Sequence, residues 1–206
     1  MEITNQDFSN LLQYIFMGIQ RGSIYALAAM GFNIIYNSTG VINFAQGEFV
    51  VYGGLMMVSL TMTMNLPVPV AFFFTVLFVM LIGILMERLT INTVKSPTVL
   101  RLVIITIGVS IFLEGIAMVS WGKNSHVLRH FSSSETFEVF GAMILPQTLW
   151  IIGILVFIAL GFILFFNYTM TGKCMRACSI NRDAARLVGI NDRKMVMISF
   201  ALSAGI

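Results

Sequence analysis

Polar residues and glycines gather in one otherwise apolar part of the chain. The residue types there that could bind a solute are Asn37, Thr39, Gly40, Asn43, Gln46, Gly47 and Glu48. An ionised side chain at the centre of a membrane helix costs about 2.5–3.5 kcal/mol, so intramembrane polar residues mark solute or ion sites. The turn-forming residues from Asn37 to Gly40 predict a helix that breaks at membrane depth, where protein or a wet cavity must cover it. We therefore predict that this stretch lines a solute path.

The side chains around the break have two possible roles. Thr39 is expected to cap the N-terminus of the following helix, whose free N–H groups would face a substrate carboxylate. Asn43, Gln46 and Gly47 would then fall in the first turns of that helix. Alternatively, Asn43, Gln46 and Glu48 only join neighbouring helices through hydrogen bonds. Glu48 could bind a proton or cation, or pair with Arg21.

A second polar stretch runs from Gly172 to Asn191 and is rich in basic residues. Asn181 is expected to cap a short helix that ends at Gly189 in a left-handed conformation. Such a helix either lies at the membrane surface or docks onto a cytosolic partner. We expect docking, through the residues Arg182, Asp183, Ala184, Ala185, Arg186 and Gly189. Arg182 and Arg186 are four residues apart, so they share one face and can meet acidic groups of the partner.

The amino-acid composition indicates which kind of secondary structure carries these two polar stretches. Of the 206 residues, 58% are apolar and 10% charged, whereas soluble domains carry about 45–50% and 25%. The apolar runs are continuous, which predicts membrane-spanning helices rather than a barrel. The predicted fold class is all-α: a polytopic transmembrane helix bundle in contact with lipid, with a broken or re-entrant helix near its N-terminal third. A net charge of +3 is too small to indicate a nucleic-acid partner.

Six hydrophobic stretches are visible, at Leu11–Tyr36, Val41–Leu66, Pro67–Met86, Leu100–Val119, Leu149–Phe166 and Met195–Ile206. The first is interrupted by Gln20, Arg21 and Ser23. The last is too short to cross a bilayer. We therefore expect residues 1–206 to form a single transmembrane domain that is truncated at its C-terminus.

The positive charges predict the topology. The segments Glu87–Arg101 and Thr169–Lys194 are rich in lysine and arginine and are expected in the cytoplasm, whereas the mixed segment Ser120–Thr148 is expected outside. Cys174 and Cys178 would then lie in a reducing compartment, so we expect neither a disulfide nor a metal site.

Two stretches resemble a known family. GSIYALAAMGFNIIYNSTGVINFAQGEF, from Gly22 to Phe49, resembles the signature of the LivH family, the permease subunits of branched-chain amino acid ABC transporters. RACSINRDAARLVGIN, from Arg176 to Asn191, is similar to the EAA-x-x-x-G coupling loop of ABC importers, with Asp183 in place of Glu. Gln46 stands where many members have His, and roughly the last third of a full permease is missing after Ile206.

The resemblance implies a multi-pass subunit of the plasma membrane, the inner membrane in a Gram-negative source. It would move branched-chain, hydrophobic amino acids with two ABC ATPase subunits, a second LivM-type permease and an extracytoplasmic solute-binding protein. The subunit itself would be neither an enzyme nor a cofactor protein, and no phosphate loop of the form G-x-x-x-x-G-K-[ST] occurs in it. The alternatives are a permease for urea or short-chain amides, an ion-coupled secondary transporter that uses Glu48 and Arg21, and a non-transporting membrane scaffold.

Overall fold

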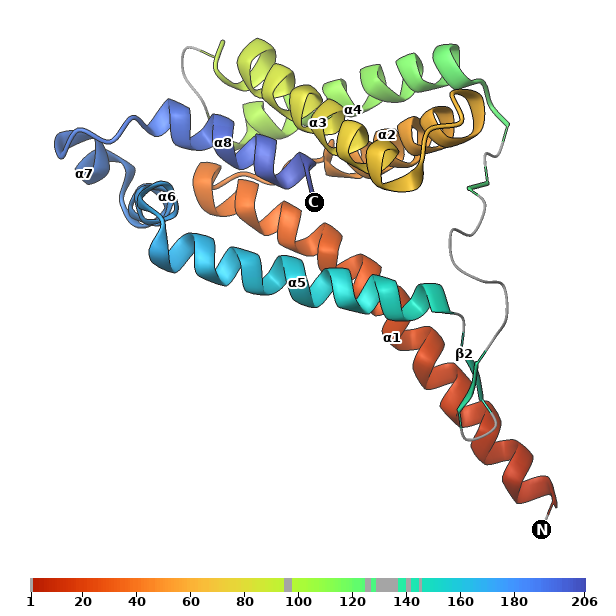
Figure 1. The fold of residues 1–206 in the computed structure, drawn as a ribbon. Helices are drawn as coiled ribbons and strands as arrows, with labels where there is room; N and C mark the ends of the chain where they lie inside the picture. The colour runs from red at the N-terminus through yellow and green to blue at the C-terminus, as the bar shows by residue number, and fades with distance from the viewer. Residues whose placement is uncertain (1, 95–97, 125–126, 129–136, 140–141, 145) are drawn as a thin grey trace. The chain divides into compact units, whose positions relative to one another are not determined.

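The described residues form helices and one short two-stranded hairpin (Figure 1). The computed structural model describes residues 2–94, 98–124, 127–128, 137–139, 142–144 and 146–206. The α-helices are α1 (Glu2–Thr39), α2 (Gln46–Val58), α3 (Val68–Met86), α4 (Val99–Trp121), α5 (Pro146–Tyr168), α6 (Met170–Ile180), α7 (Arg182–Leu187) and α8 (Asp192–Ala204). Two π-helical turns, η1 (Ser59–Thr63) and η2 (Glu87–Ile91), extend α2 and α3.

The first of two compact units combines residues 1–27 with residues 129–161. It holds the N-terminal part of α1, most of α5 and a two-stranded hairpin. Strands β1 (Phe137–Val139) and β2 (Ala142–Ile144) pair antiparallel, with Glu138 opposite Met143. The backbone N–H of Met143 donates to Gln13 of α1 over 3.4 Å. This hairpin lies in the predicted external segment and is a small β addition to the predicted all-α fold.

The second unit, residues 28–128 and 162–206, is built around α8, which packs against α3 (Figure 1). Gly83 of α3 makes this approach possible, because a Cβ atom there would lie 2.6 Å from the Phe200 carbonyl oxygen and 2.8 Å from Ala204 Cβ. Phe200 is only 1% exposed and belongs to the buried core with Ile35. Small residues allow this close packing in a membrane, where no hydrophobic force drives helices together.

Helices α2 and α4 are joined by polar contacts along their length. Hydrogen bonds connect Phe44 just before α2 with Thr106, Glu48 with Ser110, Tyr52 with Leu113, and Ser59 just after α2 with Trp121. The partners are 61 or 62 residues apart in every case, so the two helices run in the same direction. Polar side chains in this part of the chain therefore hold parallel helices in register.

The predicted transmembrane fold class is confirmed. Among the described residues, three helices are long and apolar enough to cross a membrane: Val68–Ile91, Val99–Trp121 and Pro146–Tyr168. In the third of these helices, Pro146–Tyr168, the most apolar stretch of 18 residues contains no buried residue. This is expected for a surface that contacts lipid or another subunit. The polar residues Gln20, Arg21 and Ser23 interrupt the first hydrophobic stretch but lie within a continuous helix, because α1 extends from Glu2 to Thr39. The sidedness of the loops and the single-domain organisation stay predictions.

Candidate functional site

The predicted break lies between α1 and α2. Helix α1 ends at Thr39, Gly40 adopts φ +72°, and α2 begins only at Gln46. The Gly40 N–H donates to the Tyr36 carbonyl over 2.7 Å, and the Thr39 hydroxyl donates to the Ile35 carbonyl over 2.8 Å. The expectation that Thr39 caps the following helix is wrong. Its hydroxyl instead accepts from the Val41 N–H at 3.2 Å, so it closes the end of α1.

Asn43 lies in the turn before α2, not in the first turns of α2 as predicted. Its Oδ1 accepts from the Ala45 N–H at 3.1 Å, which stabilises the turn that leads into the helix. The side chain is only 3% exposed, and its Nδ2 has no hydrogen-bond partner among the described residues. A buried donor without a partner is costly. Asn43 is therefore the residue of the break most in need of a further contact.

A small cavity of about 10 Å³ adjoins the break. Its polar lining comes from Thr39, Asn43 and Thr106, and the rest is hydrocarbon from isoleucine, valine, leucine and phenylalanine side chains. This volume accommodates about one water molecule. The structure thus brings Thr39 and Asn43 together at one hollow, with Gly40 in the connecting turn.

The other predicted pathway residues lie elsewhere around the break. Asn37 is exposed and donates to Asn33 Oδ1 over 3.0 Å along α1. Gly47 is exposed in the first turn of α2, and a Cβ atom there would meet nothing within 4 Å. Glu48 points to α4, where its Oε1 accepts from the Ser110 hydroxyl at 2.9 Å. Arg21 belongs to the other compact unit, so its pairing with Glu48 stays a prediction.

Gln46 makes a contact between three helices. The Ser203 hydroxyl of α8 lies 2.8 Å from Gln46 Oε1 and 2.7 Å from the Gly31 carbonyl oxygen of α1, and it can donate to either. Gln46 Nε2 donates to the Ser203 carbonyl over 3.4 Å. A Cβ atom at Gly31 would lie 2.7 Å from Gln46 Nε2 and 3.0 Å from the Ser203 carbonyl oxygen, so a side chain there would displace the Gln46 carboxamide. This geometry favours the helix-joining role for Gln46.

Helix α7 has the predicted caps. The Asn181 side chain accepts from the Ala184 N–H at 3.0 Å, and Gly189 adopts φ +85°. At the C-terminal end, Gly189 N–H donates to the Arg186 carbonyl and Ile190 N–H to the Ala185 carbonyl, both at 3.0 Å. This pair of bonds is a Schellman motif, which closes the end of a helix on a left-handed glycine. Ala185 is buried, whereas Asp183, Ala184 and Leu187 are exposed.

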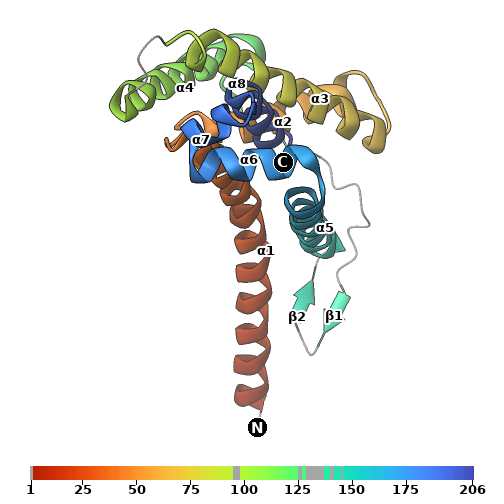
Figure 2. The same cartoon turned by 90° about the vertical axis from the view of Figure 1, so that its left-hand side faces the viewer.

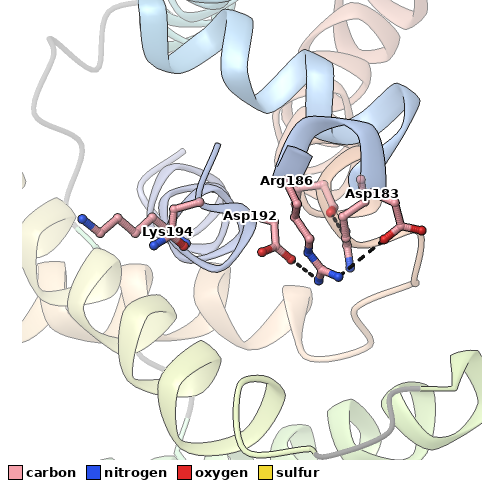
Figure 3. A network of polar contacts seen from close by, with 7 residues as sticks. Asp183, Arg186, Asp192 and Lys194 are labelled. Carbon is pink, nitrogen blue, oxygen red and sulfur yellow. Dashed lines mark hydrogen bonds and ion pairs between the residues drawn. The ribbon is translucent and has the colours of Figure 1, made fainter. Parts of the chain in front are cut away.

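The arginines of α7 make contacts within the protein, and their predicted contact with acidic groups of a partner stays a prediction. Arg186 lies 2.5 Å from Asp192 at the start of α8 and 3.5 Å from Asp183 (Figure 3). The hydrogen bond from Arg186 holds the pKa of Asp192 below its ordinary value. The pair therefore stabilises the fold above the ordinary pKa of an aspartate, and this contribution is lost as the pH falls through the lowered value.

Arg182 contacts the end of α1. Its guanidinium donates to the carbonyl oxygen of Ser38, a residue only 3% exposed. Figure 2 shows α7 near the C-terminal end of α1. The contact joins the two predicted sites, the break and the coupling helix. No local sequence signal could reveal it, because its partners are 144 residues apart.

Four of these contact partners were not predicted from the sequence: Ser38, Thr106, Ser110 and Ser203. Each is a hydroxyl residue near or inside an apolar stretch, and hydroxyls in membrane helices commonly bond to neighbouring helices. That signal indicates that such residues contact something, but it does not identify the partner.

We expect Gln46→Leu to lower the stability of the protein, since it removes a contact that joins α2 to α8. Interhelical hydrogen bonds in membrane proteins contribute about 0.6–2 kcal/mol, so the midpoint of thermal unfolding in detergent should fall. A double-mutant cycle with Ser203→Ala isolates the contact. Gly47→Ala, one residue away at an open position, is the control. Additive effects of Gln46→Leu and Ser203→Ala would contradict the contact.

Comparison with known proteins shows which protein family this chain resembles. Residues 14–206 match the family model described as branched-chain amino acid transport system / permease component. The chain is 30% identical to the high-affinity branched-chain amino acid transport system permease protein LivH of Salmonella typhimurium, and likewise to that of Escherichia coli K12. Each alignment covers 97% of this chain and 69% of the relative. BraD of Pseudomonas aeruginosa, a permease protein of the same description, is 27% identical over 95% of this chain and 67% of its own length. No solved structure matches the chain significantly.

Proposed function

This chain belongs to the family of branched-chain amino acid transport system permease components, and we propose that it forms part of the membrane path of an ABC importer for branched-chain amino acids. The match over residues 14–206 carries the proposal, because it includes both the break and α7. Separate ATPase subunits would supply the energy, a second permease would complete the path, and a binding protein would deliver the solute. The importer would lie in the plasma membrane.

The break offers chemistry that suits such a solute. Asn43 Nδ2 is a buried donor without a described partner, and it can donate to the carboxylate of an amino acid. The aliphatic lining of the adjoining cavity suits a branched hydrocarbon side chain. A cavity of about 10 Å³ is too small for an amino acid, so the solute would pass only after the helices separate. This behaviour fits an alternating-access cycle, in which one group of helices moves against another.

Helix α7 offers a surface for the ATPase. Its arginines are bound internally, but Leu187 is 89% exposed and Val188 76% exposed. Both ends of α7 are capped by hydrogen bonds. The helix can therefore transmit a movement of the ATPase, which a flexible loop could not. We propose that the ATPase binds the exposed apolar residues Leu187 and Val188 at the end of α7. Asp183 and Ala184 would lie beside this contact.

The function itself is tested by uptake. The assembled transporter, reconstituted in liposomes with its ATPases, second permease and binding protein, should import labelled leucine only when ATP is present. Unlabelled isoleucine and valine should compete, and urea should not. Urea import would support the amide-type alternative, and leucine uptake driven by a proton gradient without ATP would support a secondary transporter.

Asn43→Leu tests the solute path. Losing a hydrogen bond to a charged group costs about 1.5–3 kcal/mol, so leucine uptake should fall about 10- to 100-fold at equal membrane abundance. Asn33→Leu is the matched control, because it makes the same change on an exposed face of α1, at a residue outside the predicted solute path. Equal uptake by the two variants would show that Asn43 only shapes the turn.

Gly189→Val tests the docking of α7. A β-branched side chain at φ +85° is strained by roughly 1–2 kcal/mol or more, so the Schellman motif should open. We expect normal membrane insertion, weaker co-purification with the ATPase and loss of ATP-driven uptake. Gly161→Val, at an open helical position of α5, should change neither. Normal association and uptake of Gly189→Val would mean that α7 is only a surface helix.

A further inference from the structure

We infer that Arg182 is a positioning residue that ties the coupling helix α7 to the intramembrane break, by capping the C-terminal end of α1. The inference rests on the proposed ATP-driven import. It assigns Arg182 a role inside the permease rather than at the ATPase surface.

The contact has the chemistry of a helix cap. The last carbonyl groups of a helix lack partners within the helix and carry its negative dipole end, so a cation is stabilised there. The Arg182 guanidinium donates to the Ser38 carbonyl in the last turn of α1. Neighbouring carbonyls of that turn are satisfied locally: Ile35 by the Ser38 and Thr39 hydroxyls, and Tyr36 by the Gly40 N–H. Arg182 thus completes the end of α1 from a distant segment.

The place of this cap matters because the break follows at once. Ser38 is separated from the φ +72° position Gly40 by a single residue, and the buried Asn43 lies in the same connection between α1 and α2. A displacement of the Ser38 carbonyl therefore moves one side of the break directly. Guanidinium is suited to hold it, since it stays charged and its donors have a fixed geometry.

The other side of the break is reached from α7 through Arg186. Arg186 is ion-paired with Asp192 at the start of α8, and Ser203 near the end of α8 bonds to Gln46 at the start of α2. The two arginines of α7 thus connect to opposite sides of the break, Arg182 to the end of α1 and Arg186 through α8 to the start of α2. A rotation of α7 that carries both contacts with it would change the distance between these two sides.

The test compares Arg182→Met with Arg182→Lys in the assembled transporter. We expect Arg182→Met to co-purify with the ATPase at the wild-type level and to hydrolyse ATP. Leucine imported per ATP should fall about 5- to 150-fold, the usual range of coupling between two sites. Arg182→Lys keeps a cation and a donor at the end of α1 and should retain part of the coupling. Arg176→Met, which removes an exposed arginine of α6 that bonds to Asn167, should behave as the wild type.

Two outcomes would overturn the inference. Loss of ATPase association in Arg182→Met would place Arg182 at the docking surface, and wild-type import per ATP would show that the cap transmits nothing.

The link between α7 and α1 can also be tested in a transporter that keeps Arg182, with spin labels at the exposed positions 37 and 176. Their separation should stay constant between nucleotide-free and ATP-bound transporter if α1 moves with the α6–α7 segment, and a change would overturn the link. Failure of the proposed function would differ, because the unmodified transporter would then show no ATP-dependent import.

Discussion

A polypeptide that leaves the helical path inside a bilayer must satisfy its backbone hydrogen bonds within the protein, because lipid offers none. The turn between α1 and α2 meets this constraint with its own side chains. Thr39 closes the end of α1, Asn43 Oδ1 accepts from the Ala45 N–H, and Gly40 supplies the left-handed conformation. The remaining carbonyl of Ser38 receives Arg182 from the far end of the chain. Much of the polarity in this stretch is thus required by the backbone before any solute is considered.

Helix α8 extends the same constraint to the packing of the second unit. It approaches α3 at Gly83, where a Cβ atom would clash with the Phe200 carbonyl oxygen, and α1 at Gly31, where a Cβ atom would displace the Gln46 side chain. Ser199 and Ser203 on α8 are 0% and 2% exposed, and Ser203 reaches Gln46 and Gly31 together. Since α8 is also ion-paired to α7 through Asp192, a shift of α8 cannot occur without repacking four other helices, α1, α2, α3 and α7. Close-packed helices of this kind move as units rather than deform.

The sequence predicted best what depends on neighbouring residues. The caps of α7 at Asn181 and Gly189 follow from residue type within a window of nine residues, and the three long apolar helices follow from composition. Gln20, Arg21 and Ser23 interrupt the first hydrophobic stretch but not helix α1. Glutamine and arginine are good helix formers, so the backbone continues through them. The partners of Arg182 and Gln46 could not be identified from the sequence, because they lie 144 and 157 residues away and are fixed only by tertiary packing.

Gln46 also bears on how the transporter is driven. Its carboxamide presents a donor and an acceptor at any pH, and both face Ser203. A histidine in that place would lose its acceptor on protonation, so the junction of α2 with α8 would become sensitive to pH. With glutamine at position 46, the junction of α2 with α8 does not depend on the protonation of this side chain. Glu48 is then the only titratable side chain between residues 37 and 48, and its carboxylate is held by Ser110 in the contact with α4. Gln46 and Glu48 thus both hold α2 against neighbouring helices, which fits the proposal that the energy for opening the break comes through α7 and not through an ion bound within it.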